Sequence, residues 1–179
     1  MQKQNVTNFE ICIIKKIISH NLYFVTQDCR VFLYADDVKL VKIIDNFGDC
    51  LILQKNIDTI LRWLDSHLLT VNINKCRVMS SSRKVNVITH NYIIQGIPLI
   101  RCNEIRDLGV IIDSSLSFIP HINHICNRAT QMLGFVVRST RDFTNTDCIK
   151  TLYISLVRSI LEYCSVVWTP FYDVHMCLA

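Results

Sequence analysis

Two hydrophobic runs on either side of a pair of adjacent acidic residues constrain the fold of this 179-residue chain more than any other feature. The run 31–34 precedes Ala35, Asp36 and Asp37, and the run 38–44 alternates apolar residues with lysines. Two β-prone runs joined by a tight polar turn are typical of a β-hairpin. We therefore predict a hairpin that presents both aspartates at its turn.

Hydrophobic periodicity divides the rest of the chain into a strand-rich part and a helical part. Apolar residues at intervals of three and four predict helices over about 48–67, 118–139 and 146–163. A capping-box pattern followed by isoleucines at helical spacing predicts a further short helix over about 8–19. Short strands are predicted at 21–26, 71–79, 92–94, 98–102 and 108–112. The expected class is α+β, with sheet-forming segments giving way to paired helices near residue 116.

Composition favours a folded chain and leaves the partner open. Half of the residues are hydrophobic and 19% are charged, so a substantial core is expected. No apolar run reaches the roughly 18–20 residues that a membrane-spanning helix needs, and we expect no membrane partner. The net charge of +4, from 19 basic and 15 acidic residues, is compatible with a polyanionic partner but does not require one.

The cysteine pattern indicates a reducing compartment. The nine cysteines are spread almost evenly, are odd in number and include no Cys-x-x-Cys pair. A disulfide framework is normally denser and belongs to a smaller secreted domain. We therefore expect an intracellular chain, with nucleus and cytoplasm both open.

The two aspartates of the predicted turn are the first candidates for chemistry. Adjacent carboxylates repel each other, and a divalent cation such as Mg²⁺ is a common remedy. Two such ions can drive phosphoryl transfer by activating the attacking hydroxyl and stabilising the leaving oxygen. The alternative is a solvated acidic turn, because aspartates are common in loops.

The sequence around this pair resembles a known family. Tyr34-Ala35-Asp36-Asp37 between hydrophobic runs looks like the active-site hairpin of reverse transcriptases. Other segments resemble, in order and spacing, those of non-LTR (LINE-like, especially Jockey-like) retrotransposon enzymes: 49–63, Leu69-x-x-Asn72-x-Asn74-Lys75-Cys76, Arg106-Asp107-Leu108-Gly109-Val110, Leu133-Gly134-Phe135-x-x-Arg138 and 152–170. The likeness covers about residues 30–171.

The resemblance implies an architecture, an activity and a catalytic set. Residues 30–116 would form a partial palm, a small antiparallel sheet with a helix, and 117–179 a helical thumb-like region, while 1–29 match nothing in the family. Asp36 and Asp37 would bind Mg²⁺ and act in RNA-directed DNA synthesis. Lys75 would donate a proton to the leaving pyrophosphate, although a solvated lysine at a strand end is an equal alternative.

The resemblance also implies contacts to an RNA template and a DNA primer. Tyr34 and Ala35 would lie against the primer end and the incoming nucleotide. Leu108, Gly109 and Val110 would support the primer strand through backbone contacts, or would simply form a packed strand.

A nucleic-acid groove is a second candidate interface. Arg138 and Arg158 could contact phosphates, with Tyr153 and Trp168 stacking on bases. The alternative places both aromatic rings in the core and the arginines on an exposed face.

Departures from the family pattern bear on activity. A polymerase of this family needs a third carboxylate on an earlier strand, and a glycine-, glutamine- and proline-rich nucleotide-binding segment. Residues 1–29 contain no glycine or proline, and their only acids are Glu10 and Asp28. We therefore expect no polymerisation by this chain alone, unless a partner supplies the missing half.

Three weaker readings remain. A zinc site at His121, His124 and Cys126 lacks the paired cysteines that would complete it. The chain could be a non-catalytic nucleic-acid-binding or interaction module derived from a polymerase. It could also be a decayed reading frame, which an open sheet edge and an exposed core would make insoluble.

Overall fold

The computed structural model describes residues 9–15, 29–35, 37–82 and 87–169 of the chain. These residues form a mixture of small sheets and helices, so the predicted α+β class is confirmed. The chain divides into two compact units, residues 1–105 and 106–179, and the division falls within one strand.

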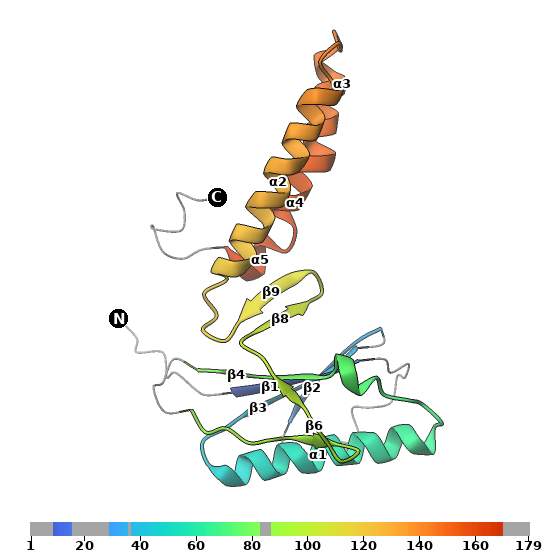
Figure 1. Cartoon of the computed structure of the whole chain (residues 1–179), viewed down its shortest axis with the longest axis vertical. Helices are drawn as coiled ribbons and strands as arrows, with labels where there is room; N and C mark the ends of the chain where they lie inside the picture. Colours follow the sequence, from blue (N-terminus) through green and yellow to red (C-terminus); the bar gives the residue numbers. More distant parts are fainter. Residues whose placement is uncertain (1–8, 16–28, 36, 83–86, 170–179) are drawn as a thin grey trace. The chain divides into compact units, whose positions relative to one another are not determined.

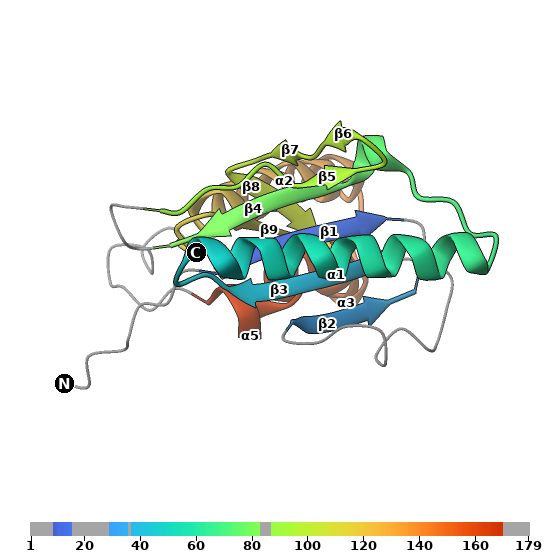
Figure 2. The same cartoon turned by 90° about the horizontal axis from the view of Figure 1, so that it is seen from below.

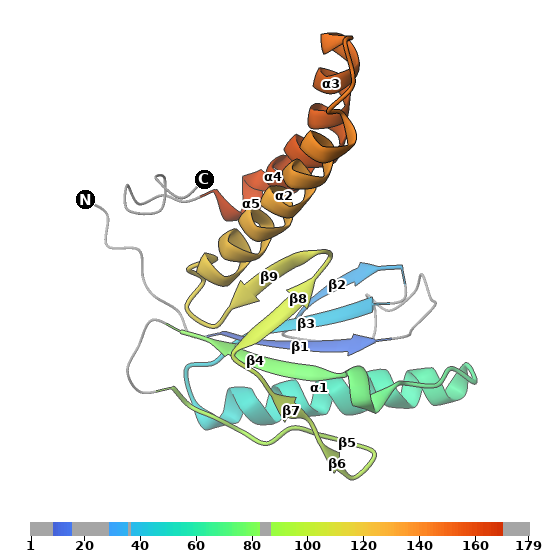
Figure 3. The same cartoon turned by 45° about the horizontal axis from the view of Figure 1, so that its top comes forward.

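A five-stranded sheet forms the centre of the first unit (Figure 3). Its strands are, in spatial order, β2 (Arg30–Tyr34), β3 (Asp37–Ile43), β1 (Phe9–Lys15), β4 (Arg77–Ser81) and β7 (Ile100–Arg101). Strand β1 is antiparallel to both of its neighbours, so β3 and β4 run in the same direction on either side of it. Helix α1 (Phe47–Ser66) connects β3 to β4, which makes a split β-α-β unit with β1 in the gap.

The predicted helix over about 8–19 is wrong for residues 9–15, which form the central strand β1, and its other residues lie outside the described ones. Cys12, Ile13 and Ile14 are almost fully buried. A strand buried on both faces reads as a continuous apolar run without alternation, and such a run cannot be told from a buried helix by periodicity. The strand predicted at 21–26 lies outside the described residues.

Helix α1 forms close to its predicted position of 48–67 because both its start and its apolar face are encoded locally. The Asn46 side chain accepts a hydrogen bond from the backbone N–H of Asp49 at 3.1 Å, and the Asp49 carboxylate accepts one from the Asn46 N–H at 3.0 Å. This reciprocal capping box satisfies amide groups that the first turn would leave unpaired. The helix then lies along one face of the sheet (Figures 1 and 2).

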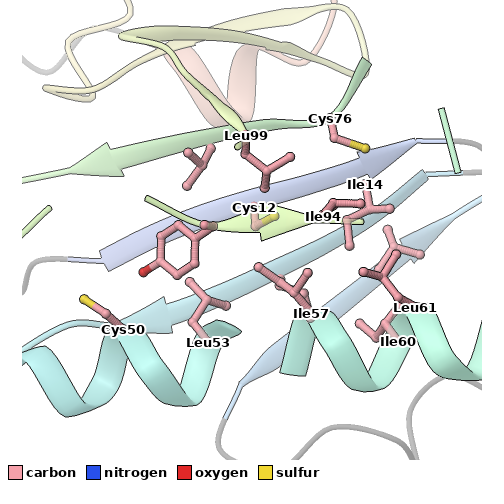
Figure 4. Packing of buried hydrophobic residues seen from close by; sticks show 14 of the residues in the cluster. Cys12, Ile14, Cys50, Leu53, Ile57, Ile60, Leu61, Cys76, Ile94 and Leu99 are labelled. Carbon is pink, nitrogen blue, oxygen red and sulfur yellow. The ribbon is translucent and has the colours of Figure 1, made fainter. Parts of the chain in front are cut away.

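The core of the first unit lies between α1 and the sheet. Leu53, Ile57 and Ile60 of the helix point toward Cys12 and Ile14 of β1 (Figure 4). All five side chains are fully buried. Burying such aliphatic side chains contributes roughly 1.5–3 kcal/mol each, so the helix and the central strand stabilise each other.

Short elements complete the first unit. The strand predicted over 71–79 begins only at β4, and Ile73–Lys75 before it forms one 3₁₀ turn, η2. The pair predicted at 92–94 and 98–102 is a small hairpin, β5 (Ile93–Ile94) and β6 (Ile97–Pro98), followed by β7. Gln95 and Gly96, predicted as a turn, both have positive φ angles.

A buried ion pair joins three strands of the sheet. The Arg101 guanidinium on β7 donates to the Glu10 carboxylate on β1 across 3.0 Å, and the Ser80 hydroxyl on β4 donates to the same oxygen at 2.9 Å. Glu10 is 1% exposed. Arg101 also donates to the carbonyl of His90 at 2.7 Å. A buried carboxylate is tolerated when it is paired and hydrogen-bonded. Here these interactions reach Oε1 of Glu10, whereas Oε2 is buried without a hydrogen-bond partner among the described residues.

The second unit begins with a hairpin and continues as a helical pair (Figures 1 and 3). Its elements are β8 (Glu104–Asp107), β9 (Val110–Asp113), α2 (Ile119–Ser139), α3 (Thr146–Leu152), the π-helical segment η3 (Tyr153–Arg158), α4 (Ser159–Glu162) and α5 (Ser165–Trp168). The predicted helices over 118–139 and 146–163 match α2 and the continuous run from α3 to α4. The single strand predicted over 108–112 is wrong at its start, because residues 108 and 109 form the turn of the hairpin.

Two absences hold within the described residues. The structure shows no disulfide among the eight cysteines that it describes. No helix in this part of the chain is long and apolar enough to cross a bilayer.

Removing Arg101 should destabilise the first unit. Arg101→Met leaves the buried Glu10 carboxylate without its cation, and we expect a loss of about 3 kcal/mol in the free energy of unfolding. The control is Arg158→Met, which removes the exposed Arg158–Glu162 pair and should cost at most about 0.5 kcal/mol. Urea denaturation followed by circular dichroism measures both. Equal effects would contradict the prediction, and a wild-type chain without a cooperative transition would favour a decayed reading frame.

Candidate metal and nucleic-acid site

The acidic turn lies between two paired strands, as predicted. Tyr34 ends β2 and is the register partner of Asp37, which begins β3. Only Ala35 and Asp36 separate them, so the connection is a two-residue hairpin loop. Ala35 has a φ of +50°, in the left-handed region that residues other than glycine rarely adopt. Asp36 itself lies outside the described residues.

Lys75 belongs to the same end of the sheet as this turn. It is the last residue of η2 and is exposed, two positions before β4 begins. The β1–β4 ladder reaches Arg77 opposite Ile13, and the β1–β3 ladder reaches Asp37 opposite Lys15. Both ladders therefore end near the last residues of β1. The register brings the segment that ends in Lys75 toward the turn, and the solvated-lysine alternative stays open.

The one acid of β1 is at the other end of that strand. Glu10 pairs with Lys42 and Ser80, five residues before Lys15. At about 3.4 Å per residue, these positions are roughly 17 Å apart along the strand. Glu10 also carries the buried ion pair with Arg101. It therefore cannot join the aspartates of the turn on a shared ion. Among the described residues, no three histidine, cysteine, aspartate or glutamate side chains gather closely enough to hold a metal.

Exposed aromatic residues follow the edge strand that leads into the turn. Phe32 is 51% exposed and Tyr34 is 62% exposed, and both lie on the sheet face opposite α1. Val31 and Leu33, which alternate with them, pack against the core beneath α1. On the same face as Phe32, Ile13 and Met79 of the central strands are buried. Among the described side chains of this face, the exposed rings are those of the β2 edge.

The residues predicted to support a primer strand form the β8–β9 hairpin of the second unit. Leu108 and Gly109 make its turn with φ angles of +45° and +88°. Val110 begins β9 and is buried in a cluster with Ile122 and Trp168. Val110 is therefore part of a packed strand, as the alternative expects. The exposed part of this segment is the turn formed by Leu108 and Gly109.

Tyr163 fixes this turn, a role that sequence reasoning missed. Its hydroxyl donates to the carbonyl of Leu108 at 2.9 Å. A Cβ atom on Gly109 would lie 3.1 Å from the Tyr163 ring, and its φ of +88° already favours glycine. The Leu108 carbonyl therefore has a partner within its own unit. The pairing of a hairpin turn with a residue 55 positions later has no local sequence signal.

The residues of the predicted arginine groove lie partly in the core and partly on two exposed helix surfaces. Trp168 is buried and donates its indole N–H to the Tyr163 carbonyl at 2.8 Å, so the core alternative holds for it. Tyr153 is 41% exposed. Arg138 is exposed near the end of α2, whereas Arg158 lies on η3 and pairs with Glu162 at 2.6 Å. The two arginines thus lie on different helices, and the charge of Arg158 is already compensated.

The weak zinc reading finds no complete ligand set. Burial first, then His124 and Arg106, lowers the pKa of His121. Its Nδ1 accepts the backbone N–H of Ile111 at 3.3 Å. A neutral imidazole is the form that binds zinc, but no third metal-ligating side chain joins His121 and His124 in the part of the chain that the structure describes.

Asp113 holds the junction between the hairpin and α2. Its carboxylate accepts backbone N–H groups of Ser117 at 3.1 Å and Phe118 at 2.7 Å, together with the hydroxyl of Ser115. Burial alone would raise the pKa of Asp113, but these hydrogen bonds outweigh it and lower the pKa below its ordinary value. Asp113 stands in the segment that resembles the family's thumb entry, yet nothing in the sequence indicated this capping role.

Comparisons of the chain with protein-family models, with curated proteins and with solved structures find no match.

Asp113 should make the second unit sensitive to acid. A carboxyl with a lowered pKa in the folded state stabilises fully above its ordinary pKa of about 4, and this contribution is lost as the pH falls through the folded pKa. We expect Asp113→Asn to lose about 1–3 kcal/mol at pH 7 and to flatten the dependence of stability on pH below 4. Thermal melts between pH 2.5 and 7 test this. Asp147→Asn, which changes an exposed aspartate on α3, is the control and should leave the wild-type profile in place.

Proposed function

We propose that this chain is the palm and thumb portion of a non-LTR retrotransposon reverse transcriptase, and that by itself it binds primer–template without extending it. The parent activity is RNA-directed DNA synthesis. The proposal rests on the family resemblance over about residues 30–171, and the geometry of the first unit supports it.

The observation that carries the proposal is the location of the acidic turn. It joins β2 to β3, with Tyr34 and Asp37 as register partners. From β3 the chain crosses through α1 to β4, and β1 fills the gap between them. A small antiparallel sheet, a helix on one face and an acidic turn at one end are what the resemblance implies for a palm. The pairs β2–β3, β3–β1 and β1–β4 are antiparallel, whereas β4–β7 is parallel.

The residues of the turn do not fit the two Mg²⁺ ions that the parent reaction needs. Two ions about 3.5–4 Å apart require carboxylates from more than one strand around them. Asp37 begins β3, but neither strand beside β3 presents a carboxylate next to it, and Glu10 is committed elsewhere. We therefore assign no chemical step to this chain alone.

A second candidate, a non-catalytic nucleic-acid-binding module, is favoured by the exposed rings of Phe32 and Tyr34. Aromatic rings on an open sheet face stack on unpaired bases, and each base contributes roughly 1–3 kcal/mol. Arg30 lies on the same face of β2 and is exposed, so a phosphate has a cation nearby. The two candidates share this binding surface and differ only in the ancestral chemistry.

A primer-extension assay combined with a binding assay tests the proposed function. We expect fluorescence anisotropy to show binding to an RNA-template/DNA-primer duplex with a single-stranded template overhang, with affinity falling steeply as salt rises. With nucleotides and Mg²⁺ present, no extension is expected. Asp36→Asn should leave binding unchanged. Extension that disappears in Asp36→Asn would overturn the inactive assignment, and no binding at low salt would overturn the proposal.

The exposed rings give a sharper test of where nucleic acid binds. Phe32→Ala and Tyr34→Ala should each weaken binding to the overhang duplex about fivefold or more, which corresponds to about 1 kcal/mol per stacked base. The matched control is Phe47→Ala, because Phe47 is 56% exposed and lies on α1, away from this face. The assignment of this surface fails if the Phe47 variant loses as much affinity as the other two.

A further inference from the structure

We infer that His121 is a pH-sensitive contact that fixes the β8–β9 hairpin and α5 to the first turn of α2, and that protonation of its ring loosens both. The contact thereby regulates the Leu108–Gly109 turn, which the resemblance assigns to the primer strand. This last step rests on the proposed function, whereas the loosening itself does not.

His121 lies where three elements of the second unit meet. It is the third residue of α2 and is 1% exposed. Its Nδ1 accepts the backbone N–H of Ile111 on β9 at 3.3 Å, and its ring meets the Trp168 ring of α5 in a T-shaped contact at 5.5 Å. Figure 1 shows α5 beside the first turns of α2. One buried side chain therefore contacts both the hairpin and α5.

Protonation removes the hydrogen bond between the ring and the hairpin. An imidazolium carries a proton on each nitrogen, so Nδ1 can no longer accept the Ile111 N–H, and two donors then face each other. Nε2 is buried without a hydrogen-bond partner among the described residues, so no acceptor is in place for the proton on that side. A buried charge without hydrogen bonds is far more costly than a buried neutral ring.

The groups that act electrostatically on His121 oppose a positive charge. Burial lowers the pKa of His121 most, followed by His124 on α2 and Arg106 on β8. A position in the first turn of α2 adds the partial positive charge of a helix N-terminus. Burial, both basic neighbours and the helix end therefore act in the same direction, and the folded unit favours the neutral ring.

Two neighbouring groups do not reverse this preference. Asp113 is the acid of β9, and its carboxylate accepts the N–H groups of Ser117 and Phe118. The Trp168 ring attracts a cation that lies over its face, but it offers no acceptor in place of the lost bond to Ile111. The indole N–H is itself a donor and is engaged by the Tyr163 carbonyl.

Trp168 connects His121 to the turn of the hairpin. Its indole N–H donates to the Tyr163 carbonyl at 2.8 Å, and the Tyr163 hydroxyl donates to the Leu108 carbonyl at 2.9 Å. A change at His121 therefore reaches the turn along two routes. One runs through β9, which begins directly after the turn, and the other through α5 and Tyr163.

The direction of the pKa shift gives the pH range. A histidine whose pKa is lowered by folding binds its proton more readily once the site has opened. The stabilisation by the neutral ring is complete above its ordinary pKa of 6.5 and declines as the pH falls below that value. Asp113 acts in a lower range, because the ordinary pKa of an aspartate is about 4. The two effects are therefore separable.

Trp168 fluorescence tests the contact in the full chain. The chain has two tryptophans, so Trp63→Phe leaves Trp168 as the sole reporter, and all variants are made in this background. We expect the emission to shift to longer wavelength in one transition between about pH 6.5 and 4.5. His121→Asn places a neutral acceptor near the Nδ1 position and should abolish this transition. His121→Gln is the second neutral variant.

The matched control is His67→Asn. His67 is exposed at the end of α1 in the first unit, and its replacement should leave the transition in place. Circular dichroism at pH 7 reports whether each variant is folded. A titration of the histidine carbon signals by nuclear magnetic resonance needs no variant that must fold, and it should give His121 a pKa below 6.5.

Primer–template binding tests whether the contact reaches the turn. Fluorescence anisotropy is measured at pH 7 and at about pH 5.5, which lies one unit below the ordinary pKa of histidine. Over this range we expect the affinity of the chain with His121 intact to fall about fivefold or more relative to His121→Asn, a typical size for coupling between two sites.

Each result decides a stated part of the inference. A pKa of His121 at or above 6.5 would overturn the pH-sensitive contact, and so would an unchanged transition in a folded His121→Asn or His121→Gln. Equal pH dependence of binding with and without His121 would overturn the regulation of the turn. Absent primer–template binding would overturn the proposed function, while fluorescence and magnetic resonance still decide on His121.

Discussion

The insertion of β1 between β3 and β4 is the constraint on which the first unit depends. Without this strand, an unfilled gap would separate β3 from β4. Helix α1, which connects them, would lose the side chains of the central strand against which it packs. Those side chains are Cys12 and Ile14 of β1, and the same strand provides a register partner for Asp37 and one for Arg77. The same seven residues therefore determine the core and the surroundings of the candidate site.

The charges of β1 are divided between its two ends, and this division shapes the proposed function. Its carboxylate, Glu10, is buried with Arg101, where it ties β1 to the strand β7. Its lysine, Lys15, is the register partner of Asp37 at the acidic turn. A catalytic palm would need the opposite arrangement, with the acid at the turn. Strand β1 therefore completes the sheet, but the residue that it pairs with Asp37 is not an acid, so this strand does not supply the further carboxylate that a two-metal centre needs.

Local sequence signals predicted most of the elements and failed where burial or long-range pairing decided the outcome. Helix α1 follows from leucines and isoleucines at intervals of three and four and from the cap at Asn46. The hairpin around the acidic turn follows from its two flanking runs. The failure at residues 8–19 came from treating Ile11 and Ile14 as one face of a helix, although a strand buried on both sides has no alternation to recognise. Tyr163 escaped notice because its partner, Leu108, is 55 residues away.

The sequence by itself determined the class of the fold, the acidic turn and the long helices, because each depends on residues within one or two turns of each other. It also contains the resemblance to reverse transcriptases, to which the comparison with solved structures adds no match. Only the tertiary structure decided that residues 9–15 form the central strand, that Glu10 belongs to a buried ion pair, and that Lys15 opposes Asp37. Register between strands that are distant in sequence is set by which side chains pack on the two faces of the finished sheet, and periodicity within one segment does not contain that information.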